Sequence, residues 1–188
     1  MDTARGRPVV GQAALDGARR RTGVRPVGVR AAQCLVPPGP GPRGRSDRSR
    51  LGPAARRPAA GGRVWQLHTD IGGWPAWLSA VTRARLDGPV APGTAFHWMT
   101  AGMSIDSTVY AVDTAHRILW GGPAHGITGV HEWTFTEDGD GVVVRTRESW
   151  AGQPVDADRD GLAAALDASL VTWLDALKKA AEQKDRRP

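Results

Sequence analysis

Short runs of alternating apolar and polar residues fill the middle of the chain, between residues 83 and 150. Alternation with a period of two is typical of strands that bury one face. Glycine, proline and aspartate separate the runs and predict turns. The predicted strands span 83–86, 94–99, 103–112, 117–120, 126–136 and 142–150. Because the turns are too short for parallel crossovers, these strands should form an antiparallel meander.

The last segment of the chain carries apolar residues at a helical period instead. These residues are spaced i, i+4, i+8, i+11, i+12 and i+15, and they are Leu162, Leu166, Leu170, Trp173, Leu174 and Leu177. That spacing places them on one stripe of a long α-helix. Two shorter helices are predicted at 64–70 and 74–80, before the strands. Since neither a meander nor a striped helix can bury its apolar side alone, the sequence predicts an α+β fold with the sheet wrapped around the C-terminal helix.

Residues 1–62 differ in composition from the rest of the chain. They hold 13 arginines and 3 aspartates, and no tryptophan, phenylalanine, tyrosine, isoleucine, glutamate or lysine. Their net charge of +10 leaves −4 for residues 63–188, because the whole chain carries +6. A segment so rich in arginine, glycine, proline and alanine cannot bury enough surface to offset the entropy of ordering. We therefore predict a disordered extension at 1–62 and a folded domain at 63–188.

Two other interpretations of the extension stay open. One is an arginine-rich arm that touches RNA or an anionic surface, although it lacks the aromatic residues that stack on bases. The other is translation in a wrong frame or from a wrong start, because the extension is dominated by residue types with GC-rich codons. Since the positive charge lies in the extension, we expect no binding of nucleic acid by the domain itself.

The single cysteine, Cys34, excludes an intramolecular disulfide and is typical of a reducing compartment. The chain shows neither a secretion signal nor an apolar run long enough to span a membrane. We therefore expect a cytoplasmic protein, present as a monomer or a weak dimer.

A predicted hairpin turns at residues 138–141 and fixes which residues of its two strands face each other. The predicted pairs are His131 with Glu148, Trp133 with Thr146, and Phe135 with Val144. This face is mostly apolar and should point inward. A buried imidazole held by a carboxylate is a candidate general base, so His131 and Glu148 are the candidate catalytic residues. The alternative is a polar pair with a purely structural role.

All eight tryptophans lie after position 62, several times the usual frequency for a segment of this length. They either fill an ordinary core or line a cavity for an aromatic or acyl ligand. The candidate ligand-binding residues are Trp77, Phe96, Trp98, Trp120, Trp133, Phe135, Thr146, Trp150, Leu166, Leu170 and Trp173. No cofactor is predicted.

Other kinds of site find little support in the sequence. His131 and Glu132 should point to opposite faces of one strand, so together with His125 they do not form a metal site. A glycine-rich phosphate loop with a lysine and a Gly-x-Ser-x-Gly elbow are both missing from the sequence, which argues against nucleotide hydrolysis and hydrolase chemistry.

Several short motifs follow one another in the order of a known fold. They are Val64-Trp65, Thr69-Asp70-Ile71, Trp74-Pro75-Ala76-Trp77, Gly88-Pro89, Pro92-Gly93-Thr94, Phe96, Trp98, Leu119-Trp120-Gly121-Gly122, Gly126-Ile127, Gly129-Val130-His131-Glu132-Trp133-Thr134-Phe135 and Thr146-Arg147-Glu148-Ser149. With the predicted helices and strands, the chain over residues 63–182 resembles the START-like or SRPBCC superfamily. Its closest resemblance is to bacterial polyketide cyclase/dehydrase-like proteins. This resemblance implies the helix-grip fold and an apolar cavity between sheet and helix.

One part of the chain departs from that family. Its members begin with a long strand before the first short helix, and residues 50–62, with two prolines and three glycines, do not predict a strand. The sheet therefore either lacks its first strand or has lost it to a frame error.

Three functions remain as hypotheses. The leading one is binding of a hydrophobic small molecule, such as a lipid, a polyketide or an aromatic metabolite. The second is a cyclase or dehydratase in which His131 acts as the base and Glu148 orients it. The third is a protein-interaction module, which an exposed apolar patch beside the missing strand would favour.

Overall fold

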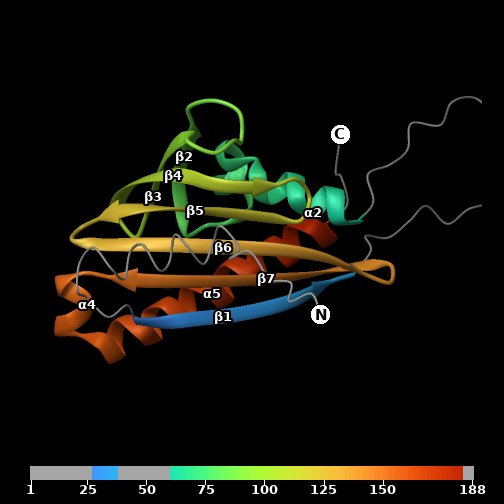
Figure 1. The fold of residues 1–188 in the computed structure, drawn as a ribbon. Coiled ribbons are helices and arrows are strands. Elements are labelled where there is room, and N and C mark those ends of the chain that lie inside the picture. Colours follow the sequence, from blue (N-terminus) through green and yellow to red (C-terminus); the bar gives the residue numbers. More distant parts are fainter. Residues whose placement is uncertain (1–26, 38–59, 184–188) are drawn as a thin grey trace, which may run out of the picture.

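Seven strands form a single antiparallel sheet in the computed structural model, which describes residues 27–37 and 60–183. Figure 1 shows the strands in the order β1-β7-β6-β5-β4-β3-β2. They are β1 Val27–Val36, β2 Val81–Leu86, β3 Ala95–Thr100, β4 Met103–Asp113, β5 Arg117–Ala124, β6 Ile127–Asp138 and β7 Gly141–Ala151. The antiparallel meander predicted from the alternation of apolar and polar residues is confirmed as β2 to β7.

The helices lie before and after this meander. They are α2 Ala60–Thr69, the 3-10 turn η1 Ile71–Gly73, α3 Trp74–Trp77, α4 Gln153–Ala157 and α5 Arg159–Glu182. Figure 1 shows α5 running along one face of the sheet, which we call the inner face. The fold is therefore the predicted α+β helix-grip fold, with an antiparallel sheet and a long C-terminal helix.

Helix α5 follows its sequence pattern closely. Five of the six stripe positions are buried, namely Leu166, Leu170, Trp173, Leu174 and Leu177, while Leu162 is half-buried. Asp158 caps the helix, since its side chain accepts a hydrogen bond of 3.0 Å from the backbone N–H of Gly161. No helix in the described ranges is both long and apolar enough to cross a membrane.

Strand β1 corrects the prediction that residues 1–62 contain no strand and that the sheet has lost its first one. Val27–Val36 pairs antiparallel with β7 along the edge of the sheet. The sequence argument looked for this strand directly before the first helix, whereas it ends more than 20 residues upstream of α2. Small residues also hid it, because Cys34 and Val36 pack inward without any aromatic neighbour in the sequence. The rest of the predicted extension, residues 1–26 and 38–59, lies outside the described residues.

Two glycines in the centre of the sheet allow a close approach of backbones. A Cβ atom on Gly122 of β5 would lie 2.2 Å from the carbonyl oxygen of Asp106 in β4. A Cβ atom on Gly121 would lie 2.2 Å from the carbonyl oxygen of Gly129 in β6. Both distances are far below a van der Waals contact, so only glycine fits here without moving the neighbouring strands.

Replacing Gly122 by alanine should therefore destabilise the protein. We expect Gly122→Ala to lower the free energy of unfolding by about 2–4 kcal/mol, because the methyl group meets backbone that cannot rotate away. The matched control is Gly72→Ala, where no heavy atom lies within 4 Å of the new Cβ. That control should change the free energy of unfolding by less than about 1 kcal/mol. Urea denaturation measures both, and equal effects would contradict the steric argument.

Candidate functional site

An aromatic cluster occupies the space between the inner face of the sheet and the helices. We use this name for eight buried rings, which are His68, Trp74, Phe96, Trp98, Trp120, His131, Trp133 and Trp173. Alternation along β3, β5 and β6 directs five of them inward from the sheet. Helices α2, α3 and α5 contribute one ring each from the other side.

The rings contact one another across the interior. Trp74 lies in the middle, with its ring centroid 4.9 Å from Trp173, 5.7 Å from Phe96 and 5.9 Å from Trp98. On the β6 side, His68 lies 4.5 Å from Trp133, and His131 lies 4.6 Å from Trp120. Most of the tryptophan contacts are edge-to-face or tilted, which is the preferred geometry for aromatic pairs. The interior is thus an aromatic contact network that joins α3 and α5 to the sheet.

Three side chains of this cluster hold polar atoms without partners. Both ring nitrogens of His68 and the indole Nε1 atoms of Trp120 and Trp133 are buried and have no hydrogen-bond partner in the described structure. Two other indoles of the cluster have partners, since Trp74 donates to the carbonyl oxygen of His68 and Trp98 donates to Ser107. Burying a polar atom without a partner costs about 1–3 kcal/mol. These four atoms are therefore the buried polar groups of the aromatic cluster that the described residues leave without a partner.

A second polar group, the pair of His131 and Glu148, has its partners within the protein. The strand register places His131 opposite Glu148, as predicted, with His131 Nδ1 3.3 Å from Glu148 Oε2. On the other side of the ring, Nε2 lies 2.6 Å from the hydroxyl of Thr146. Trp150 donates a hydrogen bond of 2.9 Å to the second carboxyl oxygen of Glu148. Nε2 of His131 is therefore hydrogen-bonded to Thr146, and Nδ1 faces the carboxyl group of Glu148.

Burial sets the charge of these groups. It lowers the pKa of His68 to about 3, and burial together with the nearby His68 lowers the pKa of His131 well below 6.5. Burial raises the pKa of Glu148 to about 7, although the hydrogen bond from Trp150 acts in the opposite direction. Near neutral pH both imidazoles are uncharged, and Glu148 is divided between its acid and its carboxylate form.

The two forms of Glu148 favour different tautomers of His131. A carboxylate at Glu148, 3.3 Å from Nδ1, favours the proton on Nδ1, so that Nε2 accepts a hydrogen bond from the hydroxyl of Thr146. A neutral acid at Glu148 favours the proton on Nε2, which then donates to Thr146. The protonation state of Glu148 therefore bears on the direction of the hydrogen bond between His131 and Thr146.

Comparison with known proteins shows the family to which the chain belongs. The family model described as "Polyketide cyclase / dehydrase and lipid transport" matches residues 55–182. The protein belongs to this family. Its membership supports a role in ligand binding or polyketide-related chemistry, and names no ligand. Comparison with curated proteins found no match.

Solved structures agree with the fold of this polyketide cyclase/dehydrase family member. A hypothetical protein from Helicobacter pylori matches 96% of this chain and 97% of its own, with 18% identity and a TM-score of 0.65. A START superfamily protein from Mycobacterium smegmatis matches 82% of this chain and 97% of its own, with 11% identity and a TM-score of 0.60. A truncated norcoclaurine synthase from Thalictrum flavum matches 86% and 97%, with 14% identity and a TM-score of 0.58. At such identities the likeness concerns the fold alone.

The structure gathers many of the predicted ligand-binding residues in this family member. Phe96, Trp98, Trp120, Trp133 and Trp173 belong to the aromatic cluster, and Trp77, Phe135 and Thr146 contact its members. Trp150 instead packs with Val155 and Ala163 in a separate small cluster, and Leu166 and Leu170 are buried on α5. Their binding role, like the catalytic role of His131 and Glu148, stays a prediction.

Sequence reasoning missed His68 and Trp74. His68 lies four residues after the buried Val64, so its helical spacing could have placed it on the inner face of α2. Trp74 was assigned to a short helix, but its central position depends on how that helix packs on the sheet. As for metals, the residues that the structure describes contain no group of three or more His, Cys, Asp or Glu side chains suited to hold one.

The raised pKa of Glu148 predicts a pH dependence of stability. In the folded protein Glu148 keeps its proton up to about pH 7, whereas in the unfolded chain it loses it near 4.5. Wild type should therefore lose stability relative to Glu148→Gln as the pH rises from 4.5 through 7, by about 3 kcal/mol in total. Urea denaturation of both proteins at pH 5 and pH 8 measures this difference. The exposed Glu137→Gln serves as control and should show no such change, while a pH-independent difference for Glu148→Gln would contradict the assignment.

Proposed function

We propose that this protein binds a hydrophobic small molecule carrying oxygen acceptors, between the inner face of the sheet and helix α5. The observation that supports this most is the set of buried, unpartnered polar atoms on His68, Trp120 and Trp133 within an otherwise apolar aromatic cluster. Membership of the family supports ligand binding in general terms.

The chemistry of these atoms narrows the kind of ligand. An indole N–H can only donate, so Trp120 and Trp133 each require an acceptor such as a carbonyl, phenol or ether oxygen. A neutral imidazole offers one donor and one acceptor, so His68 suits a hydroxyl or a carbonyl group. The surrounding rings favour a flat or aromatic body. An oxygenated aromatic compound or a polyketide meets these requirements better than a saturated acyl chain, whose body lacks acceptors.

Binding requires the aromatic cluster to open. Its rings contact one another in this structure, so a ligand has to replace part of these contacts with its own. From the helical side, Trp74 on α3 and Trp173 on α5 make most of the contacts, and His68 on α2 makes the others. We therefore propose that a shift of α3 and α5 away from the sheet admits the ligand.

A second candidate function is catalysis of the cyclase or dehydratase type. The observation in its favour is Glu148, whose pKa of about 7 suits a group that exchanges protons at neutral pH. Because Nε2 of His131 is hydrogen-bonded to Thr146 and Nδ1 faces Glu148, Glu148 would exchange the proton with the ligand and His131 would position Glu148. The third hypothesis, a protein-interaction module, gains no support, because β1 occupies the edge of the sheet where an exposed patch was expected.

Two ligands of the same shape test the need for an acceptor. Fluorenone differs from fluorene by a single carbonyl oxygen, and both can be titrated while tryptophan fluorescence is recorded. We expect saturable quenching, with fluorenone bound roughly 3 to 10 times more tightly because of a hydrogen bond from a buried N–H group. Trp133→Phe and Trp120→Phe remove the donors, and at least one of them should abolish this preference.

Trp65→Phe is the matched control, since Trp65 is half-buried and lies outside the aromatic cluster. It should leave the preference for fluorenone unchanged. If neither compound binds saturably, and palmitate does not either, the proposed function is wrong.

His68 should contribute to binding at the expense of stability. His68→Leu replaces a buried imidazole without partners by an apolar side chain of similar size, so we expect the free energy of unfolding to rise by about 1 kcal/mol. The same change should weaken fluorenone binding several-fold. Urea denaturation and fluorescence titration measure the two effects. A loss of stability would show instead that the imidazole has a partner in solution that holds the fold together.

A further inference from the structure

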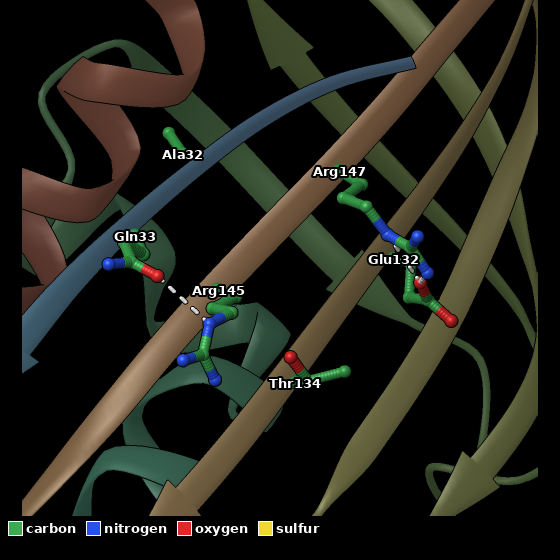
Figure 2. Close-up of a pocket in the computed structure, with 6 residues that line it drawn as sticks. All are labelled: Ala32, Gln33, Glu132, Thr134, Arg145 and Arg147. Atoms are coloured by element: carbon green, nitrogen blue, oxygen red, sulfur yellow. Dashed lines mark hydrogen bonds and ion pairs between the residues drawn. The ribbon is translucent and has the colours of Figure 1, made fainter.

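A pocket on the outer face of the sheet, opposite the aromatic cluster, has a volume of about 410 Å³. Six residues line it, and Figure 2 shows them on three neighbouring strands, β1, β6 and β7. They are Ala32, Gln33, Glu132, Thr134, Arg145 and Arg147. In β6 and β7 these residues alternate with the inward-facing ones, so this pocket is separate from the proposed interior site.

Two guanidinium groups of this pocket are held in place by their neighbours. Arg145 donates a hydrogen bond of 2.9 Å from Nε to the amide oxygen of Gln33, across the β1–β7 pair. Arg147 donates to Glu132, with its Nε 3.0 Å from Oε2 (Figure 2). Arginines fixed in this way lose little further side-chain freedom when they bind a ligand.

The carboxylate of Glu132 is already shared between two arginines. Arg117 donates to its other oxygen at 2.6 Å, and the side chain of Glu132 is 9% exposed. Burial alone would raise the pKa of Glu132, but the hydrogen bonds from Arg147 and Arg117 outweigh it and hold the pKa below its usual value. Glu132 is therefore ionised, and its single negative charge faces two positive ones.

The balance of charge around the pocket is positive. Arg145 and Arg147 line the pocket, and Arg117 lies beside it, so three positive charges face the carboxylates of Glu132 and of Asp113, which is paired with Arg117 in the strand register. The partner that holds Arg145 is a neutral amide. Residues 63–188 carry a net charge of −4, so the lining of this pocket has the opposite sign of charge to the domain as a whole. The amide N–H₂ of Gln33 and the hydroxyl of Thr134 add neutral donors to the lining.

We propose that this outer pocket is a binding site for a small anion, a phosphate or carboxylate group, with Arg145, Arg147 and Thr134 as its donors. Guanidinium groups match the geometry of both kinds of anion and form strong, charge-assisted hydrogen bonds with them. The anion would neutralise the positive charge that Glu132 leaves over. This site does not depend on the interior one, so either can exist without the other.

Calorimetric titration of the full chain with inorganic phosphate, at constant ionic strength, tests the site. We expect saturable binding that Arg145→Gln weakens roughly tenfold or more, since it removes a charged donor. Thr134→Val keeps the charge and removes one neutral donor, so it should weaken binding a few-fold. A parallel titration with succinate decides whether phosphate or carboxylate is the preferred group.

The matched control is Arg83→Gln, which removes an exposed positive charge from β2, at the opposite edge of the sheet. It should leave the affinity for phosphate within about twofold of wild type, because an exposed charge so distant is largely screened. Equal weakening by Arg83→Gln and Arg145→Gln would overturn the proposal in favour of general surface charge. Absence of saturable binding of both phosphate and succinate would overturn it as well, and urea denaturation checks that each variant is folded.

Discussion

The packing of α5 against the inner face of the sheet is the interaction on which the rest of the structure depends. The sheet contributes most of its buried apolar side chains from that face, and among the described helices α5 is by far the longest. Helix α5 supplies the cover through Trp173, Leu174 and Leu177, which join the core cluster of the sheet. Burial of this kind stabilises by about 25 cal/mol per Å² of apolar surface. Any path of a ligand into the interior therefore has to compete with these contacts.

The side chains of the interior bear on how a ligand could replace the contacts between α5 and the sheet. A core made only of aliphatic side chains would contain no polar atoms that need a hydrogen-bond partner. Here the contacts are made by flat rings, and His68, Trp120 and Trp133 retain polar atoms without partners. Each buried polar atom without a partner costs free energy relative to an apolar atom in the same place. In the binding mode proposed above, a ligand that satisfies these atoms and stacks on the rings would recover part of the free energy lost when α5 shifts.

Most of the features that could be predicted from the sequence follow from the spacing of apolar residues along single helices and strands. The stripe of α5 and the opposition of His131 and Glu148 follow from spacing along one segment, and both are found. Trp74 reaches its central position only because α3 packs against the sheet, and the ring nitrogens of His68 are buried only because α2 does. Such tertiary packing cannot be predicted from local spacing. Strand β1 was missed because the composition was averaged over residues 1–62, which are rich in arginine, glycine and proline. That average hid a stretch of ten residues that pairs with β7. Trp150 lies in the same alternation as the inward-facing residues of β7, but it packs against Val155 of α4 and Ala163 of α5 and not against the aromatic cluster.

The register of the β6–β7 pair sets the chemistry of both faces at once. The pairing that puts His131 opposite Glu148 inside also puts Glu132 opposite Arg147 outside. A slip of β7 by one residue would turn Arg145 and Arg147 inward and Trp150 outward, so the chemistry of each face depends on the same register. Strand β1 extends this constraint, since it pairs Gln33 with Arg145 and Ala32 with Thr146. Without β1, strand β7 would be an edge with unpaired backbone groups, and Arg145 would lose the amide that orients it. The first strand therefore both protects the interior and completes the outer pocket.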